Sequence, residues 1–192
     1  MKLHYAVEPS HPSKAAKAMG TDLKTSFKNT WNVCAAIKGM PLREAQEYLE
    51  EVLEHKRCIP YRRFSGGVGR TGQAKEWKTS QGRWPQKSVK VVMSLLQNAE
   101  SNAEFKNLSP DKMIVKYIAA NRARQGRRRT YRAHGRIGAY LSQPCHVQII
   151  LQEKEEQVEK PEANTKVVAF NKKGLAMLRM KENRIKTKKT KK

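Results

Sequence analysis

The chain has 192 residues, of which 40 are Lys or Arg and 17 are Asp or Glu, giving a formal net charge of +23. This length suits one domain of about 100–150 residues with a terminal extension. No apolar run approaches the roughly 20 residues needed to cross a bilayer, and the N-terminal region lacks the apolar core of a signal peptide. We therefore expect a soluble, intracellular protein. So large a charge destabilises the free protein by self-repulsion and favours a polyanionic partner.

The first half of the chain predicts two consecutive helices. Residues 1–27 are predicted to be irregular except for a short strand over 23–27, where apolar and polar residues alternate. Asn29 or Thr30 is suited to cap a helix that runs through 40, and Pro41 fits the first position of a second helix over 41–56. That helix carries a row of carboxylates that we expect to face away from an anionic partner: Glu44, Glu47, Glu51 and Glu54.

The next region, residues 57–87, holds eight basic residues, one acid and five glycines. Its weak apolar periodicity predicts an ordered loop without its own core, and so long a loop in a compact domain is usually functional. A long helix is predicted over 86–106. Two strand-like runs, 113–120 and 145–152, then predict a β-hairpin. After Glu153 we expect a polar linker and a basic tail with a short helix.

The glycine-rich segment GGVGRTGQ (66–73) has the spacing of a dinucleotide-binding fingerprint and of the start of a P-loop. Its context fits neither motif, because Gln73 and Ala74 stand where a P-loop has Lys and Ser or Thr, and no apolar strand precedes the glycines. The glycines are better suited to bringing the backbone close to a phosphate, beside Arg62, Arg63 and Arg70.

Between Asp111 and Glu153 there is no acidic residue, and seven arginines fall within 15 residues of this stretch. They are Arg122, Arg124, Arg127, Arg128, Arg129, Arg132 and Arg136. Uncompensated guanidiniums repel one another and hold an ordered shape only against a dense array of anions. A folded RNA is the best candidate, because Arg pairs bidentately with phosphate and stacks on bases.

Other side chains are candidates for metal binding, acid–base catalysis or base stacking. The cysteines Cys34, Cys58 and Cys145 are widely spaced without a C-x-x-C motif, so we expect buried reduced thiols, no metal and no cofactor. His134 has no carboxylate within 112–152 to orient it, which favours a polar RNA contact over acid–base catalysis. The aromatic residues among the arginines either stack on bases or pack against the body: Trp77, Trp84, Tyr131 and Tyr140.

From these patterns we predict a set of RNA-binding residues. They are Arg62, Arg63, Arg70, Arg83, Trp84, Lys87, Arg122, Arg124, Arg127, Arg128, Arg129, Tyr131, Arg132 and Arg136.

Several stretches together resemble one family. They are FKNT (27–30), AIKGM (36–40), PYRRFSGGVGR (60–70), QGRWPQKS (81–88), NAESNAEF (98–105), RRRTYRAHGRI (127–137) and PCHVQIIL (144–151). In this order they are similar to the large-subunit ribosomal protein family numbered seventeen in the eukaryotic scheme and twenty-two in the bacterial one. The long loop and the basic tail resemble its eukaryotic members.

The resemblance implies an α+β fold, with a small three-stranded antiparallel sheet packed on three helices, a long protruding β-hairpin and a basic C-terminal tail. It implies a structural, non-enzymatic protein with an rRNA-binding domain over 1–154, including loop 57–87 and hairpin 113–152, and an extension over 155–192. The implied partners are rRNA of the large subunit, neighbouring ribosomal proteins and the nascent polypeptide, with no membrane. The implied location is the cytoplasmic ribosome, after assembly in the nucleolus.

The family's hairpin lines the nascent-peptide exit tunnel. Carried over by position, the tunnel-lining tip comprises Arg127, Arg128, Arg129, Thr130, Tyr131, Arg132, Ala133, His134, Gly135 and Arg136.

A second class of function stays open, namely a nucleic-acid enzyme or remodelling factor with a basic arm. Nucleases and polymerases need clustered carboxylates to hold Mg²⁺. In this chain the carboxylates that fall into an ordered pattern lie along the helix over 41–56, which favours the structural ribosomal protein.

Overall fold

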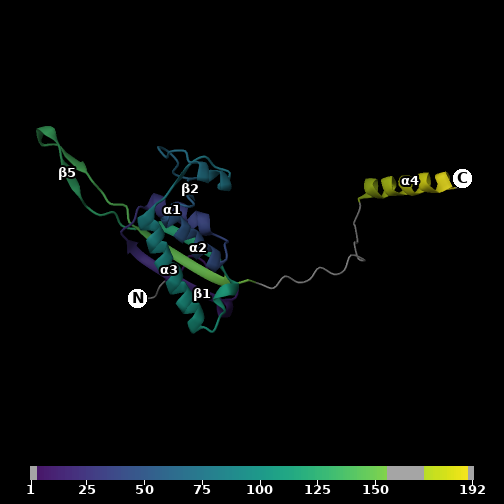
Figure 1. Cartoon of the computed structure of the whole chain (residues 1–192), viewed down its shortest axis with the longest axis horizontal. Helices are drawn as coiled ribbons and strands as arrows, with labels where there is room; N and C mark the ends of the chain where they lie inside the picture. Colours follow the sequence, from purple (N-terminus) through teal and green to yellow (C-terminus); the bar gives the residue numbers. More distant parts are fainter. Residues whose placement is uncertain (1–3, 155–170, 190–192) are drawn as a thin grey trace. The chain divides into compact units, whose positions relative to one another are not determined.

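The computed structural model describes residues 4–154 and 171–189 (Figure 1). The chain forms two compact units, Met1–Glu155 and Glu156–Lys192. The linker predicted after Glu153 falls almost wholly on residues 155–170, which lie outside the described residues, as do the last three residues of the tail.

Three α-helices belong to the first unit: α1 (Phe27–Ile37), α2 (Leu42–Leu53) and α3 (Gln86–Phe105). They lie where the sequence predicts helices, with shifted ends. Helix α1 stops before residue 40 because Gly39 takes a φ of +87°, and α2 stops before residue 56 because His55 takes a φ of +61°. Such left-handed residues end helices by turning the backbone out of the helical path.

The main sheet has the order β1-β7-β4, with β1 at Ala15–Leu23, β4 at Met113–Arg122 and β7 at Cys145–Glu153, all antiparallel. The prediction of an irregular N-terminal region was therefore wrong. Strand β1 reads AAKAMGTDL, which is poor in the β-branched and aromatic residues that mark strands in a sequence. Its conformation depends on pairing with β7, and the strand predicted over 23–27 is instead the junction between β1 and α1.

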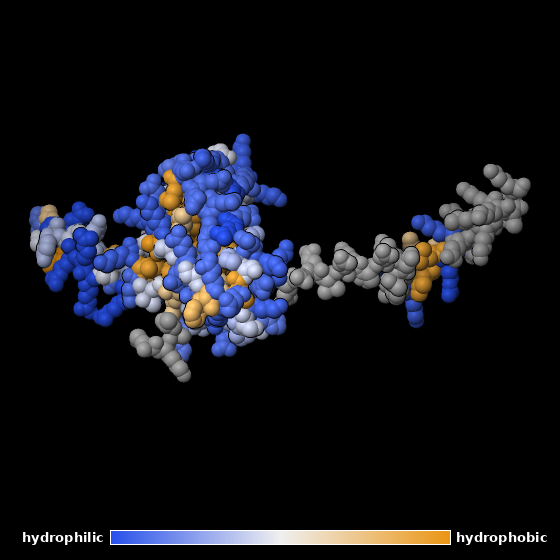
Figure 2. Space-filling view, turned by 60° about the horizontal axis from the view of Figure 1, so that its bottom comes forward, coloured by the Kyte–Doolittle hydropathy of each residue, from blue (hydrophilic) through white to orange (hydrophobic). Residues whose placement is uncertain are grey.

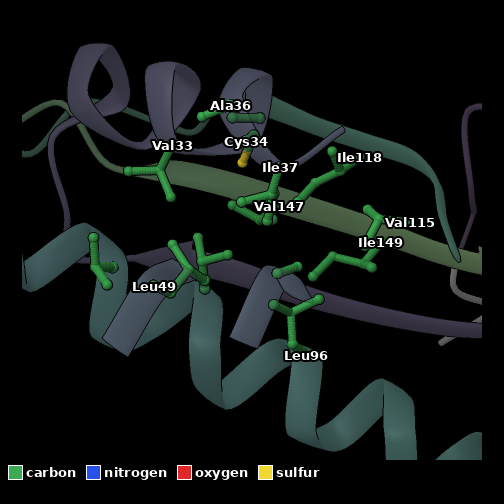
Figure 3. Packing of buried hydrophobic residues seen from close by; sticks show 14 of the residues in the cluster. Val33, Cys34, Ala36, Ile37, Leu49, Leu96, Val115, Ile118, Val147 and Ile149 are labelled. Atoms are coloured by element: carbon green, nitrogen blue, oxygen red, sulfur yellow. The ribbon is translucent and has the colours of Figure 1, made fainter. Parts of the chain in front are cut away.

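One face of this sheet packs against all three helices. Alternate β7 residues point into the core, namely Val147, Ile149 and Leu151, and they meet Ile37 of α1 and Leu96 of α3. Figure 3 shows these side chains converging from the helices and the strands. Together they form the α+β architecture that the sequence predicted, and burial of this apolar surface is the main stabilising contribution. The thiols of all three cysteines are free and buried, as expected.

The basic loop folds back on itself and is closed by a short ladder between β2 (Ile59–Pro60) and β3 (Gly82–Arg83). A 3₁₀ helix at Gly72–Trp77 lies between them. Three buried side chains of the loop belong to the main hydrophobic cluster: Ile59, Tyr61 and Val68.

Strands β4 and β7 continue out of the body as a narrow arm, defined as residues 122–144 (Figure 1). Its tip is a second ladder of β5 (Arg129–Tyr131) and β6 (Ile137–Ala139). Between the two ladders the strands are joined by a single bridge, Gly126 to Ser142. The chain reverses at His134 and Gly135, whose φ angles are +58° and +68°.

The second unit contains α4 (Lys172–Lys189), in the tail where a short helix was predicted. Among its described side chains, Leu175 and Leu178 are exposed. Ile185, which the sequence places in the same helix, has a side chain outside the described residues.

We expect Gly82→Ala to destabilise the protein by about 1–3 kcal/mol, because overpacking forces the neighbouring atoms to move. A Cβ at Gly82 would lie 2.7 Å from Cys58 Sγ and 3.2 Å from the Ile59 carbonyl oxygen. Urea unfolding of the full chain measures the change. The matched control is Gly66→Ala in the same loop, where a Cβ meets nothing within 4 Å. Equal stability of the two variants would contradict this close packing.

Candidate nucleic-acid interface

Three aromatic rings join the basic loop to the first helix. The ring of Phe64 lies edge-on to Phe27 at 5.9 Å and to Trp31 at 5.8 Å, between ring centroids. Phe64 also has a φ of +59°, an unfavourable conformation for a bulky residue. Backbone strain of this kind persists only where the surrounding contacts enforce it, so these rings fix the position of the loop on α1.

This aromatic cluster, Phe27, Trp31 and Phe64, also carries cations. The guanidinium of Arg63 lies 5.2 Å from the Trp31 ring and 5.3 Å from the Phe64 ring. At the other end Arg122, where the arm begins, lies 5.1 Å from Phe27. Cation–π contacts orient a guanidinium without neutralising it. The cluster therefore brings a loop arginine and an arm arginine onto one surface with their charges available.

Two other predicted loop arginines brace the loop from within. Arg62 donates to the Trp77 carbonyl at 3.0 Å, and Arg83 donates to the Gly67 carbonyl at 2.6 Å. The Tyr61 hydroxyl donates to Asn29 Oδ1 at 3.0 Å, which ties the loop to α1. Burial raises the pKa of Tyr61, so this hydroxyl keeps its proton and the bond persists.

The predicted Arg70 lines an open cavity of about 590 Å³ on the loop surface. Two lysines that were not predicted line the same cavity, Lys75 and Lys78, together with the hydroxyl residues Thr71, Thr79 and Ser80. Cations and hydroxyl donors are the groups that hold a phosphate. Both lysines lie within the basic loop, so their charge could have identified them from the sequence.

A second cavity, of about 1030 Å³, lies where the arm leaves the body. It is the hairpin-root cavity, and it brings together three predicted residues that are distant in the sequence: Lys87, Arg124 and Arg128. Lys24 and Tyr140 also line it, and the sequence analysis did not select them as binding residues.

The remaining arm arginines are exposed: Arg127, Arg129, Arg132 and Arg136. Among the described residues, none of them forms an ion pair. Two arginines of the body do form ion pairs. Arg43 pairs with Glu100 and Asp111, and Arg57 pairs with Glu51 and Glu76. Figure 2 shows the arm as a strongly hydrophilic surface.

The predicted aromatic residues differ in their surroundings. Trp84 is half-buried, packs its ring against His55 at 5.2 Å and donates to Gln73 Oε1 at 3.1 Å. Trp77 packs against Tyr48 at 5.4 Å. The two tryptophans therefore pack against the body, whereas Tyr131 on the arm is 75% exposed.

The acidic row on α2 has mixed surroundings. Glu44, Glu47 and Glu54 are exposed, and Glu51 is half-buried beside Arg57. Within the described part of the chain, no three His, Cys, Asp or Glu side chains gather closely enough to hold a metal ion. No helix there is long and apolar enough to span a bilayer.

A folded α+β body with an arginine-rich arm is the architecture of a protein suited to a polyanionic partner. The family described as Ribosomal protein L22p/L17e matches residues 18–152, and the chain belongs to it. It is accordingly a ribosomal structural protein and not an enzyme.

Individual relatives agree with the family. The protein named large ribosomal subunit protein uL22 from Caenorhabditis elegans is 53% identical over 160 residues, covering 83% of this chain and 86% of the relative. Proteins with that name from Phlebotomus papatasi and Drosophila melanogaster are each 56% identical over 156 residues, covering 81% of this chain and 84% of the relative.

We expect Phe64→Ala to weaken both the fold and RNA binding. Losing a half-buried ring with two aromatic partners lowers the free energy of unfolding by about 1–2 kcal/mol. Releasing Arg63 from its rings weakens binding to a structured RNA by about two- to fivefold at a fixed salt concentration. Phe105→Ala is the control, since Phe105 is 90% exposed. Filter binding and urea unfolding test both effects, and similar values for the two variants would count against the aromatic cluster.

Proposed function

We propose that this chain is a structural constituent of the large ribosomal subunit, where it binds and stabilises rRNA. The rRNA-binding domain extends over 1–154, and residues 155–192 form a basic extension. The binding surface comprises the basic loop, the hairpin-root cavity and the arm, with the fourteen RNA-binding residues predicted from the sequence. Its partners are rRNA and neighbouring large-subunit proteins in the cytoplasmic ribosome, after assembly in the nucleolus.

The observation that carries this proposal is the unequal pairing of arginines. Two body arginines, Arg43 and Arg57, pair with carboxylates, whereas the arm concentrates seven arginines with no acid. A two-stranded ribbon is marginally stable in water even without such repulsion. Phosphates supply the missing counter-charge, and the release of their counterions favours binding.

The finer proposal is that the tip of the arm lines the nascent-peptide exit tunnel. In β5 the side chains of Arg129 and Tyr131 lie on one face of the ribbon and Thr130 lies on the other, because strand side chains alternate. A ribbon that binds RNA with one face leaves its other face free for a passing polypeptide. This alternation of side chains supports the proposal that the tip, residues 127–136, contacts RNA with one face and the nascent polypeptide with the other.

We expect the tagged chain to co-sediment with the large subunit through a high-salt wash. Simultaneous replacement of Arg122, Arg124 and Arg129 by Ala is expected to lower the fraction of the chain that co-sediments with the large subunit several-fold. The reason is that each of these guanidiniums contacts phosphate in the proposed complex. The control removes the same charge from the body surface, through Ala at Lys14, Lys38 and Lys116. Equal losses in the two triple variants would mean that bulk charge alone drives assembly, and sedimentation with the small subunit would refute the proposal.

The tunnel proposal predicts a separation of assembly from elongation. Among single alanine replacements at Arg127, Arg128 and Arg136, at least one is expected to leave subunit yield near normal and to change ribosome pausing on particular nascent sequences. Ribosome profiling measures the pausing, and Lys116→Ala on β4 is the control. If all three variants fail to assemble, or all three assemble with unchanged pausing, the tip does not face the tunnel.

A further inference from the structure

The hairpin-root cavity is assembled from three separate segments of the chain. Its wall includes residues 22–26 before α1, Lys87 at the start of α3, and both strands of the arm. Four cationic side chains and one carboxylate, Asp22, line it. Such an excess of positive charge in a concave space selects for an anionic occupant.

Two helices begin at this cavity. Ser26 immediately precedes α1 and Lys87 lies in the first turn of α3, and both line the cavity. Neither helix has an acidic residue in its first turn or a side chain that caps its backbone. The first-turn N–H groups and the helix dipoles add to the attraction of the surrounding lysines for a phosphate.

The cavity also has an aromatic wall. Tyr140 lines it and is 58% exposed, so its ring is free for further contact. The Tyr140 backbone N–H donates to the Arg128 carbonyl at 2.8 Å, which fixes the main chain at this residue, and the Arg128 guanidinium lies 5.2 Å from the ring centroid. A ring beside a guanidinium is a surface on which an RNA base stacks.

The floor of the cavity is rigid. Thr25 Oγ1 lies 3.2 Å from Cys145 Sγ on β7, and Thr30 Oγ1 lies 3.1 Å from both Thr25 Oγ1 and Ser88 Oγ. These buried groups connect α1, α3 and the sheet beneath the lining residues. A preformed site of this kind loses little conformational entropy when it binds.

We propose that the hairpin-root cavity receives one unpaired nucleotide of the RNA, with its phosphate near Lys24 and Ser26 and its base against Tyr140. This rests on the proposed function, because the nucleotide belongs to the RNA that the chain binds. A paired duplex offers phosphates but hides its base faces in the stack, so it uses the lysines and leaves the ring without a partner. A nucleotide displaced from the stack uses both the lysines and the Tyr140 ring.

The test uses subunits that carry the full-length chain as wild type, Tyr140→Leu or Tyr140→Phe. They are probed with dimethyl sulfate and with a reagent that acylates flexible 2′-hydroxyls. We expect Tyr140→Leu to raise the reactivity of one nucleotide by about tenfold, because it loses its stacking partner. Tyr140→Phe keeps the ring and stays near the wild-type reactivity. Phe105→Leu is the control, because Phe105 is 90% exposed and lies outside both the cavity and the proposed binding surface, and it leaves that nucleotide unchanged.

Gly126→Ala provides an independent variant that removes no binding group. A Cβ there would lie 2.3 Å from Ser142 Oγ, so the Ser142 hydroxyl, which lines the same cavity, must turn away from its present position. The same nucleotide is expected to become more reactive. If subunits contain normal amounts of the variants and no nucleotide responds to Tyr140→Leu or Gly126→Ala, the inference is overturned while the proposed function stands.

Two further outcomes separate the hypotheses. If the wild-type chain is absent from large subunits, the proposed function is wrong, and the inference that rests on it is wrong too. Adenosine 5′-monophosphate titrated into the purified full chain tests a free nucleotide as the source of the same chemistry. Binding that is lost in Tyr140→Leu, together with no Tyr140-dependent nucleotide in the subunits, would assign the cavity to a soluble nucleotide and overturn the RNA assignment.

Discussion

The pairing of β7 on both sides is the interaction on which the rest of the structure depends. Its nine residues hydrogen-bond to β1 along one edge and to β4 along the other, and its inward side chains meet the helices. The arm is the continuation of the β4–β7 pair past the edge of the body. A one-residue shift in this register would turn the core residues of β7 to the opposite face of the sheet and redirect the arm at the same time.

Both edges of the sheet are covered, and this cover keeps the β4–β7 pair from pairing with strands of other chains. Backbone groups of Gly39 and Met40 pair with Val115 on β4, while Asn102 and Lys106 of α3 donate to carbonyls of β1. Open edges are templates for aggregation, a serious hazard for a chain that must remain soluble before it meets its partner. The connection between α1 and α2 thus has a protective role in addition to joining two helices.

The sequence was sufficient for elements whose signals are local. Helices α2 and α3 show apolar residues at helical spacing, and the arginine-rich arm is visible as a run without acids. Strand β1 was missed because its alanines and glycine carry no strand preference outside the sheet. The contacts of Phe64 with α1 and the grouping of Lys24 with Tyr140 depend on residues far apart in the chain, so no local pattern reveals them.

The interrupted pairing in the arm has a consequence for the path of its tip. Between the ladder that ends at Arg122 and the ladder that begins at Arg129, the strands share one bridge and few backbone bonds. A weak segment between two paired segments acts as a hinge. Local opening of this segment costs less free energy than opening either ladder, so the tip can change direction as a unit while the β4–β7 pairing of the body stays intact.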